Sequence, residues 1–338
     1  MEIVNNHRIT DLTTFGVNAF AGCFAEATTE DEVRAVFRND LFLNNNRLTL
    51  GAGSNLLFTK DFEGFILRIN LRGISIAGET EEFVFVKVAA GEVWDDFVNW
   101  CIERNLGGTE NMVAIPGMVG SSAVQNIGAY GSEVKDIIHE VETLEIPTGK
   151  THILTNAECN FAYRDSIFKH PDGENFVVIS VLFKLSKKSV PNIGYGDVAA
   201  ELKSAGVEKP SIADVANIIR SIRLRKLPDP KDIGNAGSFF KNPVIEKSQH
   251  DTLKQTYLNI PGYIVNDTFV KVPAAWLIEQ CGWKGFRKGD AGVYEKQPLV
   301  LVNYGNATGQ EILTLAENIR ASVLETFNIR LEFEVRIV

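Results

Sequence analysis

The stretch from Gly107 to Gly131 restricts this chain's fold more than any other part of the sequence. A loop of this length in a compact domain is usually functional or disordered. This one is too apolar for a solvated linker, because Met112, Val113 and Ile127 are spread along it. Its glycines would let the backbone approach a flat ligand, and their amides can bond phosphate or ring carbonyl groups. We therefore expect an irregular segment, without helix or strand, that holds a buried aromatic dinucleotide.

A second glycine-rich turn, Gly51–Asn55, follows the predicted strand Arg47–Leu50. It resembles a dinucleotide-binding turn, but Leu56 occupies the place of the third glycine and no helix with a later acidic residue follows. A nicotinamide-binding Rossmann domain is thus a poor fit. Two readings stay open, a plain hairpin-like turn or a nest of backbone amides that cradles a diphosphate.

Charge and composition exclude several classes of partner. The 338 residues carry 43 acidic and 34 basic side chains, a net charge of −9, without the Lys/Arg clusters of a nucleic-acid footprint. No apolar run is long enough for a membrane span, and Met1–Phe15 lacks a signal peptide's apolar core. The four cysteines lie far apart and the five histidines are scattered, so we predict no metal site. We expect a cytoplasmic protein without nucleic-acid or membrane partners.

Helical and strand patterns alternate along the whole chain, which indicates an α+β or α/β class. The stretches Lys187–Lys209 and Lys226–Asn242 read as irregular, and the first suggests a domain boundary near residues 200–210. The predicted helices are 31–38, 94–104, 211–224, 274–280 and 310–327, and the predicted strands are 47–50, 64–70, 83–90, 141–146, 176–185, 299–303 and 331–337.

Seven motifs, in order along the chain, make the sequence similar to a known family. They are Ile115–Ser122, Gln125–Gly131, Phe161–Ser166, Lys226–Pro230, Gly234–Pro243, Ala274–Ile278 and Leu331–Arg336. Together they resemble the UDP-N-acetylenolpyruvoylglucosamine reductases. The resemblance implies an α+β chain with the vanillyl-alcohol-oxidase-type (PCMH-type) FAD-binding fold of two subdomains, here 1–70 and 71–205. It also implies an α/β substrate-binding domain, 206–325, and a terminal strand, 326–338, that returns to the active site.

The same resemblance implies which residues bind the ligands. FAD would be held noncovalently, since neither glycine segment contains a cysteine or histidine for a covalent bond, and NADPH would be the co-substrate. The implied FAD-binding residues are Gly51, Ala52, Gly53, Ser54, Asn55, Pro116, Gly117, Gly120, Ser121, Ser122, Gln125, Asn126, Gly128, Tyr130 and Gly131. The implied substrate-binding residues are Tyr163, Tyr195, Lys226, Asn242, Tyr263, Lys284 and Gln297, and Tyr195 and Tyr263 point to the longer family type with a tyrosine loop over the substrate.

The implied reaction reduces the enolpyruvyl ether of a UDP-sugar to a lactyl ether, by hydride transfer from flavin N5 to the alkene. Negative charge then develops on the neighbouring carbon and its carboxylate, so the site needs donors at the carboxylate and a proton source at carbon. By the motif match, Arg164 is the carboxylate clamp, Glu334 the acid that stabilises the enolate with it, and Ser238 the proton donor.

Each of these three residues also has a blander interpretation. Arg164 could form a structural ion pair with Asp165, and Ser238 could be a turn or N-cap serine. Glu334 lies on the polar face of the alternating strand Leu331–Ile337, where it could simply face solvent. To donate a proton it would need a raised pKa through partial burial. Phe333 departs from the family pattern, which usually has proline there, but it leaves both neighbouring glutamates in place.

Two other classes of function are alternatives to this reductase. A different flavin oxidase or dehydrogenase on the same fold would keep the glycine segments but lose the Ser238 and Glu334 motifs. A flavin- or nucleotide-binding module without enzymatic activity would have no reason to keep Arg164, Ser238 and Glu334 together. The resemblance also leads us to expect a monomer that acts on small molecules.

Overall fold

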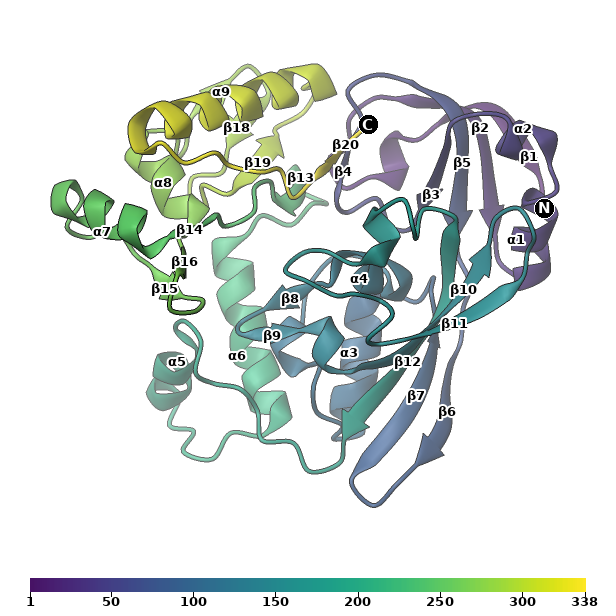
Figure 1. Cartoon of the computed structure of the whole chain (residues 1–338), viewed down its shortest axis with the longest axis horizontal. Coiled ribbons are helices and arrows are strands. Elements are labelled where there is room, and N and C mark those ends of the chain that lie inside the picture. Colours follow the sequence, from purple (N-terminus) through teal and green to yellow (C-terminus); the bar gives the residue numbers. More distant parts are fainter. The chain divides into compact units, whose positions relative to one another are not determined.

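The computed structural model describes all residues, 1–338, as a chain of mixed helices and strands (Figure 1). The chain divides into two compact units. Both units are discontinuous in sequence. Unit 1 contains Met1–His7, Ala21–Ala52 and Glu63–Arg225, and unit 2 contains Arg8–Phe20, Gly53–Phe62 and Lys226–Val338. The four-part division drawn from the sequence stays a prediction.

The first sheet of unit 1 has the strand order β1-β2-β5-β3, in which β3 pairs parallel to β5. Two short helices follow β2. The first is capped by Thr29, whose hydroxyl accepts the backbone N–H of Glu32 while the Glu32 carboxylate accepts that of Thr29, a capping box. The elements are β1 Ile3–Arg8, β2 Phe20–Ala27, α1 Glu30–Val36, α2 Asp40–Leu43, β3 Arg47–Leu50 and β5 Phe62–Ile69.

The second sheet of unit 1 is fully antiparallel, in the order β11-β10-β12-β7-β6. Helices α3 and α4 pack on each other, and α4 also contacts β7 and β12. The rings of Trp94, Phe97 and Phe183 are completely buried between helix and sheet. The elements are β6 Ile74–Glu79, β7 Phe83–Ala89, α3 Trp94–Glu103, α4 Val119–Gln125, β10 Ile138–Glu145, β11 Thr151–Thr155 and β12 Phe176–Ser186.

Unit 1 also shows that two expectations of irregular structure were wrong. The glycine-rich stretch contains a 3-10 turn, η2 Glu110–Met112, the helix α4 and the start of a small hairpin. The stretch 187–209 contains α5 Val198–Ser204. The remaining elements of unit 1 are β8 Gly128–Ala129, β9 Ser132–Glu133, η3 Val134–Asp136, η4 Ile167–Lys169 and α6 Ile212–Lys226, whose last residue falls in unit 2.

Unit 2 is built on an antiparallel sheet, β13-β19-β18-β17, with helix α9 packed on β18 and β19 (Figure 1). A smaller sheet, β14-β16-β15, carries helix α7, and β4 pairs parallel to β20. The elements are η1 Thr10–Leu12, β4 Leu56–Leu57, β13 Gly234–Ser238, β14 Val244–Glu246, α7 Lys247–Thr256, β15 Tyr263–Ile264, β16 Phe269–Lys271, α8 Ala274–Gln280, β17 Arg287–Lys288, β18 Ala291–Val293, β19 Val300–Asn303, α9 Gly309–Phe327 and β20 Arg336–Ile337.

Two expectations about unit 2 were also wrong in part. The stretch 226–242 is not wholly loop, because β13 pairs with β19. At the C-terminus the alternation holds for burial, with Leu331 and Val335 almost completely buried, but only Arg336–Ile337 forms a regular strand. None of the helices combines the length and apolar character that crossing a bilayer requires.

Candidate active site

The glycine-rich stretch of unit 1 is held in place by α3 and α6. The indole Nε1 of Trp94 donates to the Met112 carbonyl at 2.9 Å, and the Ala114 amide donates to Asp95 at 2.6 Å. Asp95 in turn accepts two hydrogen bonds from the Arg220 guanidinium, at 2.6 and 3.2 Å. A bidentate Arg–carboxylate pair fixes orientation as well as distance, so these charge-assisted bonds position the segment around Ala114, between η2 and α4.

Helix α4 carries several of the residues predicted to bind FAD. The Ser121 hydroxyl caps its first turn, with the Met118 amide donating to it at 3.1 Å. At its C-terminal end the side-chain oxygen of Gln125 is buried and has no hydrogen-bond partner in the protein. Buried acceptors are normally satisfied, so an unpaired one inside a predicted ligand segment is the kind of group that a bound molecule would satisfy.

Asn126 ends helix α4 in the left-handed conformation, with φ 43°. It is completely buried and its side chain is fully occupied. Nδ2 donates to the Ala162 carbonyl at 2.7 Å and to Glu133 at 3.1 Å, while Oδ1 accepts the Lys135 amide at 3.1 Å.

The second glycine turn is divided in sequence, with Gly51 and Ala52 in unit 1 and residues 53–55 in unit 2. Gly53 has φ 61°, and a Cβ there would lie 2.2 Å from the Leu12 carbonyl oxygen, so only glycine fits. Asn55 donates from Nδ2 to the Glu334 carbonyl at 3.0 Å, and its backbone carbonyl accepts the Arg336 amide at 3.1 Å. The turn therefore anchors the C-terminal segment inside unit 2.

Arg164 occupies the third position of a tight turn in unit 1, closed by paired hydrogen bonds between Ala162 and Asp165. Its φ is 56°, a region that favours glycine or asparagine. The guanidinium donates to the Gly128 carbonyl at 2.6 Å and to the Asn126 carbonyl at 3.4 Å. The carboxylate of Asp165 lies 2.8 Å from Nε2 of His170 and accepts the Ser166 amide.

Three tyrosines predicted to contact the ligands lie in the same unit as Arg164. The Tyr163 ring lies 5.4 Å from the Arg164 guanidinium. The rings of Tyr130 and Tyr195 meet edge to face at 6.4 Å. Buried Asn111 donates to the Tyr130 and Asn192 carbonyls at 3.0 and 2.8 Å, which ties the segment that bears Tyr195 to the glycine-rich stretch.

Sequence reasoning missed Arg223, on helix α6. Its Nε donates to the Ala114 carbonyl at 3.3 Å. Burial lowers the pKa of its guanidinium, and the positive charge of Arg164 lowers it further. Tyr130 and Asp95 act in the opposite direction and raise this pKa. The positive charges of Arg164 and Arg223 are therefore close enough to interact. The available signal was the spacing of Arg220 and Arg223, three residues apart on an otherwise apolar helical face.

Ser238 is the last residue of β13, so the turn and N-cap interpretations do not describe it. The register between β13 and β19 shifts between Asn235 and Ser238, which marks a β-bulge or a similar irregularity, and Gly237 has φ 69° there. Bulges are common next to active sites because they redirect a side chain. Ser238 is half-buried, and the Asn235 side chain fixes the bulge by accepting the Gly237 amide at 3.0 Å.

Glu334 lies beside Ser238 within unit 2. Its amide donates to the Phe239 carbonyl at 2.9 Å, and its side chain is half-buried rather than fully solvated. The Phe333 ring packs on Phe239 and Phe240, at 5.4 and 5.6 Å, and a guanidinium from α9 covers it. The departure from proline therefore supplies aromatic packing that holds the segment of Glu334 against the segment of Ser238.

The other predicted substrate residues of unit 2 are spread over several loops. Asn242 accepts the Ala274 amide at 2.9 Å at the start of α8, Lys284 pairs with Glu279 at 2.7 Å, and Gln297 accepts the Leu299 amide at 3.4 Å. Tyr263, on β15, and Lys226, the last residue of α6, are exposed.

The structure thus forms two groups, each within one unit. Unit 1 brings together Tyr130, Tyr163, Arg164 and Tyr195, and unit 2 brings together Asn55, Ser238 and Glu334.

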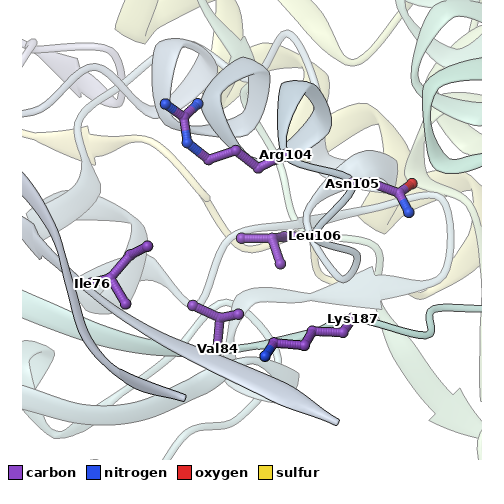
Figure 2. Close-up of a pocket in the computed structure, with 6 residues that line it drawn as sticks. All are labelled: Ile76, Val84, Arg104, Asn105, Leu106 and Lys187. Carbon is purple, nitrogen blue, oxygen red and sulfur yellow. The ribbon is translucent and has the colours of Figure 1, made fainter. Parts of the chain in front are cut away.

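A pocket of about 420 Å³ in unit 1, near the end of α3, contains none of the predicted site residues (Figure 2). Its two cations already have partners, because Arg104 stacks on Trp100 and Lys187 pairs with Glu79.

Comparison with known proteins shows which family the chain is similar to. The FAD binding domain model matches residues 21–155, and the model of the UDP-N-acetylenolpyruvoylglucosamine reductase C-terminal domain matches 229–338. A UDP-N-acetylenolpyruvoylglucosamine reductase of Flavobacterium johnsoniae is 47% identical, over 100% of both chains. The chain belongs to this reductase family. A Bacteroides fragilis reductase of the same name is 46% identical over 96% of this chain and 97% of its own.

A solved member of the reductase family supports the fold. The crystal structure of the Thermus caldophilus reductase superposes with a TM-score of 0.69 over 99% of this chain and 98% of its own, at 24% identity. The predicted α+β, PCMH-type fold is therefore confirmed. The family models and the 47% identical reductase confirm the resemblance stated from the motifs. The chain is a flavin-dependent oxidoreductase with FAD as its cofactor.

Proposed function

We propose that this protein reduces the enolpyruvyl ether of UDP-N-acetylglucosamine enolpyruvate to UDP-N-acetylmuramate, with NADPH as the reductant, in the supply of peptidoglycan precursors. The observation that carries the proposal is the match to the Flavobacterium johnsoniae reductase along the whole length of both chains. The unpaired cysteines suit the reducing cytoplasm in which we expect the protein to act.

The residues present fit a noncovalent FAD. The unpaired buried oxygen of Gln125 is an acceptor of the kind that a ring N–H of the flavin needs. The residues that would hold the cofactor are the fifteen named above, in segments 51–55 and 116–131. When bound, FAD supplies the hydride that reduces the alkene. Acid-precipitated protein that stays yellow after washing would contradict noncovalent binding.

Three residues of this chain would act on the substrate. Arg164 would bind the substrate carboxylate with its guanidinium fork, which stays charged throughout the reaction. Glu334 would donate a hydrogen bond to the enolate, and Ser238 would deliver a proton to the carbanion carbon. The proximity of Ser238 and Glu334 in unit 2, and the fixed side chain of Arg164 in unit 1, support these assignments.

The rest of the substrate would be bound by seven polar or charged side chains, those of Lys226, Asn242, Tyr163, Tyr195, Tyr263, Lys284 and Gln297. Lysines suit the charge of a diphosphate, and tyrosine, asparagine and glutamine suit the polar groups of uridine and sugar. We expect the enzyme to act as a monomer.

An anaerobic two-step experiment tests the proposed function. NADPH should bleach the flavin absorbance of the purified protein, and the enolpyruvyl UDP-sugar should then restore it and yield the lactyl ether. UDP-N-acetylglucosamine, which lacks the enolpyruvyl group, is the control and should leave the flavin reduced. Bleaching by small alcohols or hydroxy acids, with no reoxidation by the enolpyruvyl ether, would instead favour another flavin oxidase on this fold.

A further inference from the structure

The backbone that presents Arg164 is strained, and its neighbours hold it in that conformation. A positive φ at an arginine places Cβ close to the following carbonyl oxygen, so the residue would relax if nothing opposed it. Such conformations persist only where the surrounding contacts fix them.

Two groups of contacts fix this turn from opposite ends. On one side, the buried Asn126 side chain donates from Nδ2 to the Ala162 carbonyl at 2.7 Å. The backbone carbonyl of Asn126 accepts a hydrogen bond from the Arg164 guanidinium. On the other side, the Lys169 ammonium donates to the Arg164 backbone carbonyl at 2.8 Å. The guanidinium and the backbone carbonyl of Arg164 therefore both take part in hydrogen bonds that hold the turn.

The two residues that follow Arg164, Asp165 and Ser166, are also held by hydrogen bonds. His170 Nε2 lies 2.8 Å from Asp165 Oδ2, and the Ser166 hydroxyl donates to the Val124 carbonyl at 2.7 Å, which ties the turn to α4. The pKa of Asp165 is lowered although burial alone would raise it, because the hydrogen bonds from His170 and the Ser166 amide outweigh the burial. The carboxylate therefore stays charged and keeps these bonds near neutral pH.

We propose that Lys169 and Asn126 are positioning residues, which hold the Arg164 turn so that the guanidinium fork is preorganised for a carboxylate. The inference rests on the proposed role of Arg164. It differs from the flavin-binding role that the family resemblance implies for Asn126. Its physical basis is that a misplacement of about 1 Å in a binding group can cost about 100-fold in rate.

Lys169 is the better residue to test, because it is exposed and its replacement leaves the core intact. Lys169→Met keeps the apolar stem and removes the donor to the Arg164 carbonyl. Flavin reoxidation by the enolpyruvyl UDP-sugar should slow by about 10-fold, whereas flavin reduction by NADPH should be unchanged. Lys169→Arg retains a donor and should restore most of the rate.

The matched control is Lys187→Met. Lys187 also donates to a backbone carbonyl, that of Thr80, at 2.9 Å, and it also lies in unit 1, but it has no contact with the Arg164 turn. Both half-reactions should be unchanged in this variant. A loss equal to that of Lys169→Met would mean that any lysine bonded to a backbone carbonyl in unit 1 matters, and would overturn the inference.

An Arg164→Ala background separates the inference from the proposed function. If Lys169 acts through Arg164, then Lys169→Met should cause no further loss of reoxidation rate in that background. If Arg164→Ala slows reoxidation but the two losses add, or if Lys169→Met alone does nothing, the positioning role is wrong and the proposed function stands. If Arg164→Ala itself leaves reoxidation unchanged, both are wrong.

Discussion

We expect the orientation of Ser238 to depend on its neighbour Gly237, which has φ 69° at the point where the strand register shifts. The sequence showed a serine flanked by glycine and phenylalanine, and the motif match gave it a role, but neither revealed the local shift in strand register. Its position depends on pairing with β19, about 60 residues further along the chain, which no local pattern encodes.

A substitution at Gly237 should separate the effect of Ser238 orientation on rate from the effect of backbone strain on the stability of the fold. A Cβ at Gly237 meets nothing within 4 Å, so Gly237→Ala adds only the strain of its positive φ, about 1 kcal/mol of unfolding free energy. Because Ser238 follows directly, we expect the flavin reoxidation rate to fall more than the stability loss explains. Thermal unfolding and anaerobic reoxidation, measured on the same sample, check this.

Gly206→Ala provides the control for backbone strain. Gly206 follows helix α5, has φ 73° and also has open space around it. It should lose a similar amount of stability without any change in reoxidation rate. Equal effects of both substitutions on reoxidation would mean that Gly237 does not orient a reacting group.

Among the elements, those with strong local signals were predicted well. Strand 47–50 and helix 274–280 match β3 and α8, and helix 310–327 differs from α9 by one residue. Their apolar periodicity matches their final burial, and α9 begins with a Thr308–Glu311 capping box.

Elements that depend on tertiary contacts could not be predicted. Helix α4 contains glycine and two serines, which are weak helix formers, and it depends on packing against β12. Strand β13 reads Gly-Asn-Ala-Gly-Ser and has no intrinsic strand preference, so pairing with β19 decides its structure. In both cases the sequence gives functional motifs but poor local propensity.

The second, antiparallel sheet of unit 1 contains a charged contact whose effect on stability should depend on pH. Glu142, on β10, lies 2.6 Å from the Lys87 ammonium and accepts the Ser180 hydroxyl at 2.6 Å. Burial alone would raise the pKa of Glu142, but these hydrogen bonds and the lysine charge hold it below its ordinary value of 4.5. A lowered pKa in the folded state means that the unfolded chain binds the proton more readily.

Glu142→Gln should therefore cost stability near pH 7, by less than about 1 kcal/mol because the pair is partly solvated. The difference from wild type should shrink as the pH falls below 4.5, through the lowered pKa of Glu142. Urea unfolding over this pH range measures it, with Glu81→Gln, in the exposed turn after β6, as the control. A pH-independent difference would rule out the charge as its cause.

At the scale of the whole molecule, unit 2 is not a simple C-terminal domain. Its core includes Phe15, Val17 and Leu57, which come from segments far earlier in the chain. Asn303 donates to the Phe15 carbonyl at 3.1 Å, and a Cβ at Gly234 would lie 2.3 Å from that carbonyl oxygen. The sequence could suggest the substrate domain by resemblance, but not these contributions, because they depend on contacts nearly 300 residues apart.

A C-terminal fragment should therefore fail to fold alone. Residues 226–338 lack the apolar side chains of segments 8–20 and 53–62 and also the β4 partner of β20. We expect weak chemical-shift dispersion and no cooperative unfolding, because the exposed core would lose several kcal/mol of burial free energy, about 25 cal/mol for each Å². A cooperative thermal transition in this fragment, with native-like helical content, would contradict this account of unit 2.

The proposed chemistry of the whole enzyme is tested most directly by separating the two half-reactions in Ser238→Ala. Flavin reduction by NADPH needs no proton at a substrate carbon, so its rate should match wild type. Flavin reoxidation by the enolpyruvyl UDP-sugar should slow by about 100-fold or more, the usual scale for a positioned acid. Ser248→Ala, at an exposed position of α7, should change neither rate. Equal slowing of both half-reactions in Ser238→Ala, or no slowing of reoxidation, would contradict the assignment of Ser238 as the proton donor.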